Sequence, residues 1–393
     1  MKNCERKKIV LSSNTSWSIF NFRFGLIEEL LKNYKVIVVA PKDKHSEKLI
    51  DLGCKYYDIY IDRKGTNPIN DLKTFWQYYR LYKKIKPNIA LHFTIKPNIY
   101  GNLASQLLGI PVVNNITGLG TLFIKKNFIT YLVEIMYKIA FRNSFVFFQN
   151  REDKELFVQK KLVKRYDVLP GSGINTEKFK PIKTEKKDDI FRFLLIARMI
   201  WDKGIGEYVE AAKIIKQKYK DVEFLLLGPV GVDNPTAIPK EQIDKWQKEG
   251  LVKYLGTIDD VKNIIAKVDC VVLPTYYREG VPKVLLEASA MEKPLIATNI
   301  AGCKEVVEDG MNGYLCKIKD AKDLADKMEK ILNLSEDKRK EMGKAGRKKM
   351  IKEFDERIVI EKYLEVLSFI GLNSSIFLDI VLNNFNPIFF NFF

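Results

Sequence analysis

The sequence predicts an α/β protein built from two consecutive Rossmann-like, doubly wound domains that face each other across a cleft. Short apolar runs of strand length alternate with longer segments of helical spacing, a pattern typical of βαβ units and parallel sheets. The alternation stops near residues 168–189, where prolines, glycines and a charge run indicate a linker, and then begins again. A length of 393 residues also favours two domains over one.

Within the first half, the elements follow one another in βα order. Strands are expected where β-branched and other apolar residues form short runs, at 7–13, 34–41, 85–93 and 111–118. Helices are expected where apolar residues recur every three or four positions, at 24–33, 45–53 and 100–109. The last of these helices is expected to stop at a glycine.

The second half repeats the pattern. Strands are predicted at 191–198, 222–229, 251–256, 269–274 and 293–298. Helices are predicted at 208–220 and in a long charged region after Asp320. The predicted domains are therefore 1–180 and 190–367, and the terminal helix is expected either to stay with the second domain or to pack back on the first. Residues 368–393 form an apolar tail, which is either an interfacial anchor or, the interpretation we favour, an incidental extension.

Charge is distributed unequally between the halves. The formal net charge is +17; residues 1–180 hold 31 Lys and Arg against 15 Asp and Glu, whereas the rest of the chain holds 35 against 34. This asymmetry predicts a polyanionic partner for the first half, either anionic lipid or nucleic acid. The five scattered cysteines, the lack of a signal-peptide pattern and the lack of a long apolar run predict a reduced, cytoplasmic protein with no spanning helix.

The segment 276–298 carries the most specific chemical signal. Glu279 follows a strand directly, Gly280 allows close approach of a ligand to the backbone, and Pro282 suits the start of a helix on which Glu287 lies one turn further. A helix amino terminus at the carboxyl edge of a parallel sheet suits a diphosphate, and flanking carboxylates suit sugar or ribose hydroxyls. The pattern alone is equally compatible with a surface loop bearing two solvated glutamates.

A second signal lies at the end of the strand 191–198. Arg198 and Lys203 flank a short loop before a helix, and two cations placed there could hold a departing diphosphate without a metal. Alone, they would more often be ordinary surface charges. No D-x-D triplet and no Cys/His cluster with metal-ligand spacing occurs in the chain, so no metal site and no cofactor are expected.

Taken together, these motifs resemble those of the family 4 glycosyltransferases. Glu279 and Glu287 match the family's E-x7-E signature, Arg198 and Lys203 match its phosphate-binding pair, and residues 301–315 match the segment after the signature. The similarity covers nearly all of residues 7–367. The segments 114–123 and 230–238 narrow the resemblance to the subgroup that assembles capsules and other glycans.

The resemblance implies a GT-B fold and a retaining, metal-independent transfer from a UDP-sugar to an undecaprenyl-diphosphate-linked saccharide. The first domain would bind the acceptor at the inner face of the cytoplasmic membrane, and the second would bind the donor. The donor sugar expected first is N-acetylgalactosamine, and the alternatives are a hexose or another N-acetylhexosamine. The implied catalytic residues are Glu279, Arg198 and Lys203. The implied donor-binding residues are Arg198, Lys203, Ile258, Glu279, Gly280, Val281, Lys283, Val284 and Glu287.

Acceptor and membrane contacts are expected in the first half. Residues expected to face the acceptor are Ser13, Asn14, Thr15, His92, Thr117 and Gly118, although His92 is at least as readily explained as a structural histidine. The segment 125–143 combines an apolar stripe with cations near its ends, so it is either an interfacial helix, which we favour, or a helix packed on its own domain. Its membrane-contacting cations would be Lys125, Lys126, Lys138 and Arg142.

Two other classes of function are compatible with parts of the sequence. A UDP-sugar epimerase of the same fold would need catalytic acids in first-domain loops, which are poor in His and acidic residues. A nucleic-acid-binding protein would explain the charge, but no RNP, zinc or helix-turn-helix pattern supports it, so no nucleic-acid partner is expected. A salt-dependent RNA shift without sugar-nucleotide binding would favour that class.

Overall fold

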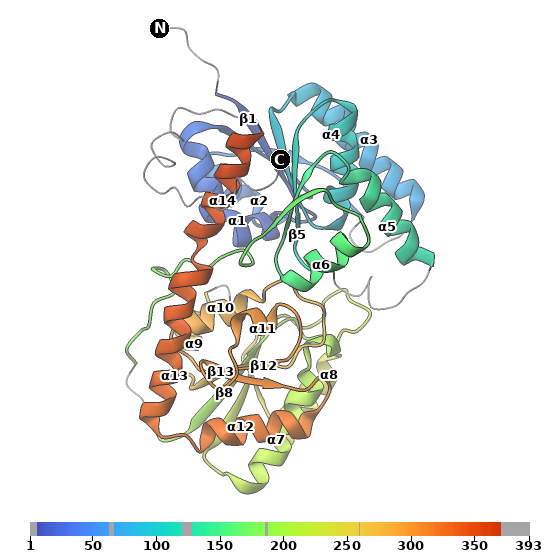
Figure 1. Cartoon of the computed structure of the whole chain (residues 1–393). Helices are drawn as coiled ribbons and strands as arrows, with labels where there is room; N and C mark the ends of the chain where they lie inside the picture. Colours follow the sequence, from blue (N-terminus) through green and yellow to red (C-terminus); the bar gives the residue numbers. More distant parts are fainter. Residues whose placement is uncertain (1–5, 63–66, 120–127, 185–187, 259, 371–393) are drawn as a thin grey trace. The chain divides into compact units, whose positions relative to one another are not determined.

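A computed structural model describes residues 6–62, 67–119, 128–184, 188–258 and 260–370 (Figure 1). The predicted α/β class is confirmed, because the strands form two sheets with helices between successive strands. The seven-stranded sheet has the order β3-β2-β1-β4-β5-β6-β7, and the six-stranded sheet has the order β10-β9-β8-β11-β12-β13. Neighbours such as β1 and β2, or β11 and β12, pair in parallel. Each sheet therefore has a switch point beside its first strand, where ligands of such sheets bind.

The seven-stranded sheet is built from the first half of the chain. Its strands are β1 (Lys8–Ser12), β2 (Lys35–Ala40), β3 (Lys55–Asp58), β4 (Ile89–Phe93), β5 (Val112–Ile116), β6 (Phe145–Phe148) and β7 (Arg165–Val168). Its helices are α1 (Ser16–Asn33), α2 (Ser46–Asp51), α3 (Pro68–Ile85), the π-helix η1 (Pro97–Gly101), α4 (Asn102–Leu107), α5 (Phe128–Ala140) and α6 (Arg151–Gln159).

The six-stranded sheet follows. Its strands are β8 (Phe191–Ile196), β9 (Val222–Leu227), β10 (Lys253–Tyr254), β11 (Cys270–Leu273), β12 (Leu295–Thr298) and β13 (Gly313–Cys316). Between and after them come η2 (Trp201–Lys203), α7 (Ile205–Lys218), α8 (Lys240–Lys248), α9 (Lys262–Ala266), α10 (Lys283–Ala290), α11 (Cys303–Val306), α12 (Ala321–Leu332), α13 (Glu336–Lys349), η3 (Met350–Phe354) and α14 (Glu356–Phe369).

The chain packs as two compact units. Unit 1 holds the residues up to 115, residues 139–146 and the described residues from 357 onward, and unit 2 holds 116–138 and 147–356. Helix α14 thus belongs to unit 1, where the Tyr363 hydroxyl accepts a hydrogen bond of 2.7 Å from the Asn115 amide. Its ring also lies 6.3 Å from that of Phe93. Helix α14 therefore packs on the first sheet.

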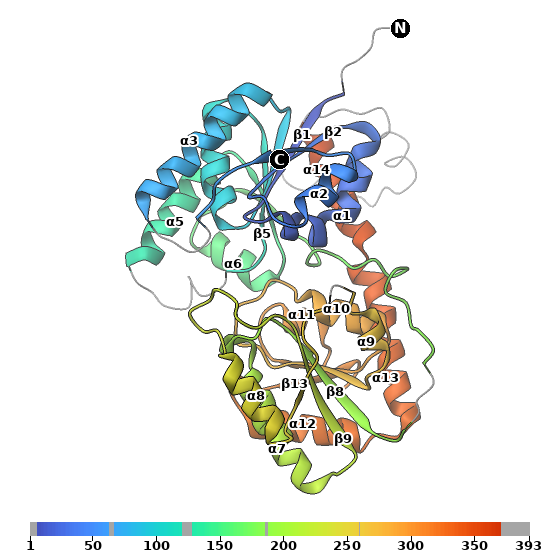
Figure 2. The same ribbon diagram turned by 180° about the vertical axis from the view of Figure 1, so that it is seen from behind.

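Alternation along the strands assigns side chains to the two faces of each sheet. In the second sheet, Phe193 and Leu195 of β8 pack with α7, α8 and α12, whereas Leu194 packs with α9, α10 and α11 (Figure 2). In the first sheet, Val10 and Ala90 share a core with α3 and α4. Because both faces are covered, the strands read as continuous apolar runs, and this is why the sequence reveals them.

Candidate active site

The loop between β11 and α10 carries Glu279. This strand ends at Leu273 and the helix begins at Lys283, so the loop lies at the carboxyl end of a strand in unit 2. Pro282 caps α10 with an extended backbone (ψ 116°) rather than forming its first turn. As in any helix, the first amides of α10 have no carbonyl partner within the helix, and they carry the positive end of its dipole. The loop thus places a carboxylate beside a site suited to an anion.

Lys203 lies directly against that carboxylate. Its ammonium forms an ion pair with Glu279 Oε1, and only 13% of the lysine side chain and 17% of the glutamate side chain are exposed. The ammonium also lies 5.2 Å from the centre of the Tyr277 ring. A lysine and a glutamate 76 residues apart are therefore brought together in a largely desolvated setting, where each strongly affects the other.

The backbone carbonyl of Asp202 holds the two loops together. It accepts hydrogen bonds from the amides of Tyr276 at 3.0 Å and Tyr277 at 3.1 Å. It also accepts one from the Thr275 hydroxyl at 3.1 Å. Since Lys203 follows Asp202 directly and Glu279 follows Tyr277 by two residues, these bonds fix the separation of the ion pair. This contact could not be predicted from the sequence, because its acceptor is a backbone carbonyl.

Two glycines allow the loops to approach so closely. Gly204, which follows Lys203, has φ +73°, and a Cβ there would lie 2.0 Å from the carbonyl oxygen of Pro274 at the end of β11. At Gly280, a Cβ would lie 2.6 Å from the carbonyl oxygen of Thr117 and 2.4 Å from the Gln149 side chain. Both positions therefore require glycine for steric reasons, and Gly204 also for its backbone conformation.

Arg198 and Tyr277 complete the charged group. The side chain of Arg198 is exposed at the carboxyl end of β8. Burial raises the pKa of the Tyr277 phenol, the Glu279 carboxylate raises it further, and Arg198 opposes this change. The Tyr277 phenol is thus influenced both by the Glu279 carboxylate and by the Arg198 guanidinium. The four side chains offer two cations, one anion and one neutral donor to a ligand.

Glu287 lies on α10, after the loop that carries Tyr277 and Glu279. Its side chain is half-buried, and burial raises the pKa of its carboxyl to about 7, although Lys283 and Lys178 act in the opposite direction. Ile258 is 40% exposed in the loop after β10. The Val281 side chain, in contrast, is buried in the core below the loop, and Val284 packs partly against that core. At Val281 only the backbone is available to a ligand.

A buried carboxylate that was not predicted from the sequence, Asp153, binds the loop that carries Glu279. The Arg278 guanidinium donates a hydrogen bond of 3.1 Å to Asp153, whose side chain is fully buried. Burial raises the pKa of the Asp153 carboxyl, whereas Asn150 and Arg278 lower it. Gly118, predicted to contact the acceptor, lies in the same unit, and a Cβ at this position would lie only 2.5 Å from the Gly280 amide nitrogen. Thr117 and Gly118 thus contact the Glu279 loop.

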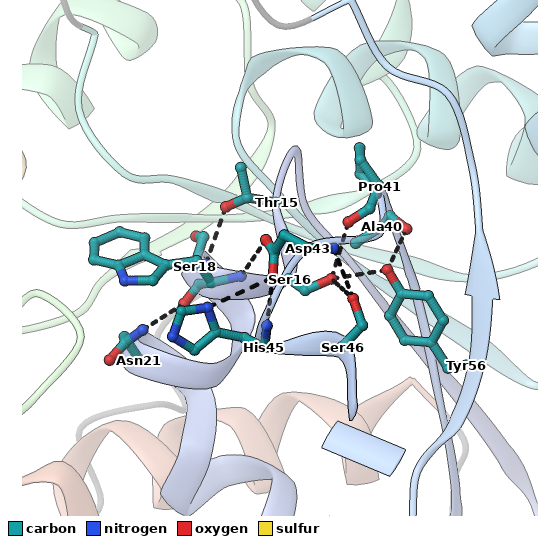
Figure 3. Close-up of polar contacts among 11 residues, drawn as sticks. Thr15, Ser16, Ser18, Asn21, Ala40, Pro41, Asp43, His45, Ser46 and Tyr56 are labelled. Carbon is teal, nitrogen blue, oxygen red and sulfur yellow. Dashed lines mark hydrogen bonds and ion pairs between the residues drawn. The ribbon is translucent and has the colours of Figure 1, made fainter. Parts of the chain in front are cut away.

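The predicted acceptor loop lies at the carboxyl end of β1 in unit 1. Thr15 caps α1, and its hydroxyl accepts a hydrogen bond of 3.0 Å from the amide of Ser18 (Figure 3). Ser13 is buried and Asn14 is half-buried. The Asn14 amide donates to the Thr94 hydroxyl at 3.2 Å. Thr94 has φ +71°, a strained conformation for a β-branched residue, at the carboxyl end of β4.

A neighbouring aspartate already occupies the amino terminus of α1. Asp43 accepts hydrogen bonds from the amide of Trp17 at 2.9 Å and from the amide of His45 at 2.8 Å (Figure 3). The hydroxyls of Ser16 and Ser46 lie 3.0 Å apart beneath it, and Tyr56 donates to the carbonyl of Ala40 at 2.6 Å. A phosphate at these amides would have to displace a carboxylate, so this helix end is not an open anion site.

The structure corrects the prediction that His92 faces the acceptor. This side chain is fully buried beneath α3, and its Nε2 lies 2.9 Å from the hydroxyl of Tyr82. The planes of the two rings are nearly parallel, and their centroids lie 6.0 Å apart. Burial lowers the pKa of His92 to about 3. His92 is therefore a neutral core residue, as the alternative interpretation held.

Helix α5 presents both polar and apolar residues to solvent. Lys138 is exposed, as are Tyr131 (61%), Leu132 (48%), Ile135 (37%) and Ile139 (54%), and so is Arg142 in the turn that follows the helix. Lys125 and Lys126 lie outside the described residues. No helix in the described part of the chain is long and apolar enough to cross a membrane. The same residues contain no group of three His, Cys, Asp or Glu arranged to hold a metal ion.

Models of two glycosyltransferase families match successive parts of the chain. Residues 176–349 match the model described as glycosyl transferases group 1, and residues 8–151 match glycosyl transferase 4-like. The chain is 30% identical over 379 residues to the N,N'-diacetylbacillosaminyl-diphospho-undecaprenol alpha-1,3-N-acetylgalactosaminyltransferase of Campylobacter jejuni, covering 91% of this chain and 98% of that protein. It is 28% identical to the UDP-Gal:alpha-D-GlcNAc-diphosphoundecaprenol alpha-1,3-galactosyltransferase of Escherichia coli, covering 73% of this chain and 76% of that protein.

A solved structure shows the same fold. The sucrose-phosphate synthase of Thermosynechococcus elongatus superposes with a TM-score of 0.78 at 18% identity, covering 94% of this chain and 100% of that chain. The predicted GT-B fold is confirmed by this likeness, which extends over both sheets.

Proposed function

The chain belongs to the group 1, family 4-like glycosyltransferases, and we propose that it transfers a hexose or N-acetylhexosamine from a UDP-sugar to an undecaprenyl-diphosphate-linked saccharide. N-acetylgalactosamine is the first candidate for the sugar, since the Campylobacter jejuni relative carries that specificity in its name. The product belongs to the assembly of a surface glycan, O-antigen or capsule.

The observation that carries this proposal is the Lys203–Glu279 pair at the amino terminus of α10. The ammonium and the helix amides suit the diphosphate of the donor, while the carboxylate suits hydroxyls of the sugar attached to it. Arg198, exposed on the same loop system, supplies the second cation. In this proposal Glu287 on α10 accepts hydrogen bonds from the ribose diol, and Ile258 lies beside the base. No divalent ion is required for this arrangement.

We propose that the reaction retains the anomeric configuration. The bond between the anomeric carbon and the β-phosphate oxygen breaks, and a bond from the acceptor hydroxyl oxygen to the same face of that carbon forms. The hydroxyl proton passes to the departing phosphate, so no glutamate acts as a nucleophile. Lys203 and Arg198 stabilise the charge that accumulates on the diphosphate as it leaves. Release of Lys203 from Glu279 toward the phosphate accompanies donor binding.

The acceptor in this proposal is anchored in the inner face of the cytoplasmic membrane, and the protein binds there peripherally. The exposed face of α5 supports this part of the proposal, because Lys138 and Arg142 lie beside an apolar stripe. The cations would attract anionic headgroups while the stripe enters the interface. The excess charge of residues 1–180 acts in the same direction.

A donor panel tests the proposal. UDP-GalNAc, UDP-GlcNAc, UDP-galactose and UDP-glucose are each assayed with short-chain polyprenyl-diphosphate sugars in detergent, and products are identified by mass and by anomeric NMR coupling. We expect one UDP-sugar to give a lipid-linked product with the α configuration of the donor. Failure of every UDP-sugar to transfer, or an inverted product, contradicts the proposal. Interconversion of UDP-sugars without transfer would identify an epimerase instead.

A further inference from the structure

Helix α3 in unit 1 has an unusual outward face. Its inward face packs Tyr78, Tyr82 and Ile85 into the core against the first sheet. Its outward face carries three large apolar residues in the first half of the helix. Their exposed fractions are 75% for Ile69, 57% for Leu72 and 48% for Trp76. A helix on a soluble protein normally presents polar residues at such positions.

Tyr60 extends this face. It is 48% exposed and lies in the loop after β3. Its amide donates to the Gln77 side chain at 3.2 Å, and its carbonyl accepts from the Thr74 hydroxyl at 3.3 Å. These bonds fix the tyrosine beside the middle of α3. We call Tyr60, Ile69, Leu72 and Trp76 the outer α3 face.

Cations outnumber acidic groups around the outer α3 face, where the nearby Asp62 carboxylate accepts a hydrogen bond of 3.1 Å from the Asn70 amide. Lys73 and Arg80 are exposed three residues before and four after Trp76, and the Lys73 ammonium lies 5.2 Å from the centre of the Tyr60 ring. Lys83 and Lys84 are exposed in the last turn. The single acidic residue of α3, Asp71, is engaged by Lys96 and by the hydroxyl of Tyr100. The exposed part of the helix is therefore cationic.

The same contacts place the outer α3 face close to the ligand edge of the first sheet. Lys96 and Tyr100 follow β4, which ends at Phe93, and both bind the first turn of α3 through Asp71. Helix α3 therefore begins at the carboxyl edge, where Asn14 meets Thr94. Ile69 and Leu72 lie within one turn of Asp71. An acceptor bound at this edge would have its lipid chain near these residues.

We propose that the outer α3 face inserts into the surface of an anionic lipid bilayer. This inference rests on the proposed function, because a lipid-linked acceptor is what brings the bilayer to this edge. Ile69 and Leu72 enter the acyl boundary, and the amphipathic rings of Trp76 and Tyr60 lie at headgroup depth. Lys73 and Arg80 contact anionic headgroups. A second copy of the chain fits less well, since a symmetric contact would oppose like charges.

Vesicle binding of the full chain tests this proposal. The variant carries Ile69→Glu and Leu72→Glu together, and the control carries Met311→Glu and Ile351→Glu, two residues of unit 2 that are 57% and 46% exposed. With phosphatidylglycerol vesicles we expect the α3 variant to partition at least about tenfold more weakly than wild type, and the control to partition as wild type does. Wild-type Trp76 fluorescence should shift to shorter wavelength on binding, and Trp76→Phe should remove most of that shift.

Transfer assays separate this proposal from the proposed function. With a short-chain acceptor in detergent, the α3 variant should transfer sugar as wild type does, whereas with a vesicle-embedded acceptor it should lose activity. Equal vesicle binding by variant and wild type overturns the proposal, whatever the enzyme transfers. Loss of a wild-type dimer in light scattering, with vesicle binding retained, assigns the face to a second copy and also overturns it. Absence of transfer by wild type in detergent refutes the proposed function only.

Discussion

Replacement of Lys203 by methionine tests the proposed centre most directly. Methionine keeps most of the aliphatic stem of lysine but removes the ammonium, so Glu279 remains and the contact to the diphosphate is lost. Removing one charged contact to a leaving group in a desolvated site raises the transition-state free energy by about 2–4 kcal/mol. This range corresponds to a fall in kcat/KM of roughly 30- to 1000-fold. Since 13% of the Lys203 side chain is exposed, the effect should lie well inside that range.

A matched variant separates catalysis from stability. Arg192 is 20% exposed and paired with Asp188 and Glu223, but it lies at the amino end of β8, the opposite end from Lys203. Arg192→Met should lower stability and leave kcat/KM unchanged. Steady-state kinetics with varied UDP-sugar, together with urea unfolding of both variants, provides the comparison.

The pair can also be examined as a double-mutant cycle. If Lys203 and Glu279 act on adjacent parts of one donor, Lys203→Met and Glu279→Gln should combine with a coupling of about 0.5–3 kcal/mol. Wild-type kcat/KM in Lys203→Met, or an equal loss in Arg192→Met, would refute the assignment of Lys203 to the donor diphosphate.

Three further predictions concern the metal, a loop glycine and the buried histidine. Transfer should persist in excess chelator, because protein cations hold the diphosphate; loss that Mn²⁺ or Mg²⁺ restores contradicts this. Gly204→Ala should destabilise more than Gly231→Ala in urea unfolding, since both have φ near +70° but only the Gly204 methyl meets a backbone oxygen, and equal losses would exclude the steric cause. His92→Phe should lower the free energy of unfolding by about 1–3 kcal/mol and leave the acceptor KM unchanged, because the ring bonds only to the core; a raised KM would return His92 to the acceptor site.

The sequence predicted most strands of both sheets, but β3, β6, β7 and β13 were not predicted. β8 and β9 stand out because burial on both faces makes them continuous apolar runs. Helix α3 was not predicted, although its buried residues Tyr78, Tyr82 and Ile85 have helical spacing. The apolar residues of its outer face break the expected amphipathic pattern, and this same feature suggests its membrane contact.

The candidate site was predictable where it depends on spacing and not where it depends on tertiary contacts. Glu279 and Glu287 stood out because a strand, a loop and a helix start follow in order, and the resemblance to family 4 glycosyltransferases then favoured a donor site over a solvated loop. The Asp202 carbonyl and the buried Asp153 were missed, since one acts through its backbone and the other lies 125 residues from its partner Arg278. His92 was misplaced because a strand-end histidine has the same sequence signature whether it faces a ligand or the core.

Burial of Glu287 is expected to make the stability of the fold depend on pH. The pKa of Glu287 is raised from 4.5 to about 7, mainly by burial, so the folded protein holds a proton on this carboxyl that the unfolded chain has already released. Stability must therefore fall as pH rises from about 4.5 to about 7, and the loss is complete above the folded pKa. A difference of this size corresponds to at most about 3 kcal/mol. A ribose diol bound to the ionised carboxylate would offset part of it.

Glu287→Gln should accordingly be more stable than wild type at pH 8, with the advantage disappearing below about pH 4.5 where both side chains are neutral. The same variant should bind UDP less tightly, because an amide is a weaker acceptor for the ribose diol than a carboxylate. Urea unfolding at pH 5 and pH 8 measures the first effect and calorimetric UDP titration the second, with the exposed Glu241→Gln as a control for charge removal. If Glu287→Gln and wild type unfold at the same urea concentration at pH 8, burial of the ionised Glu287 carboxylate does not lower the stability of the fold. If stability rises but UDP binding is unchanged, the carboxylate is buried for a reason other than the ribose.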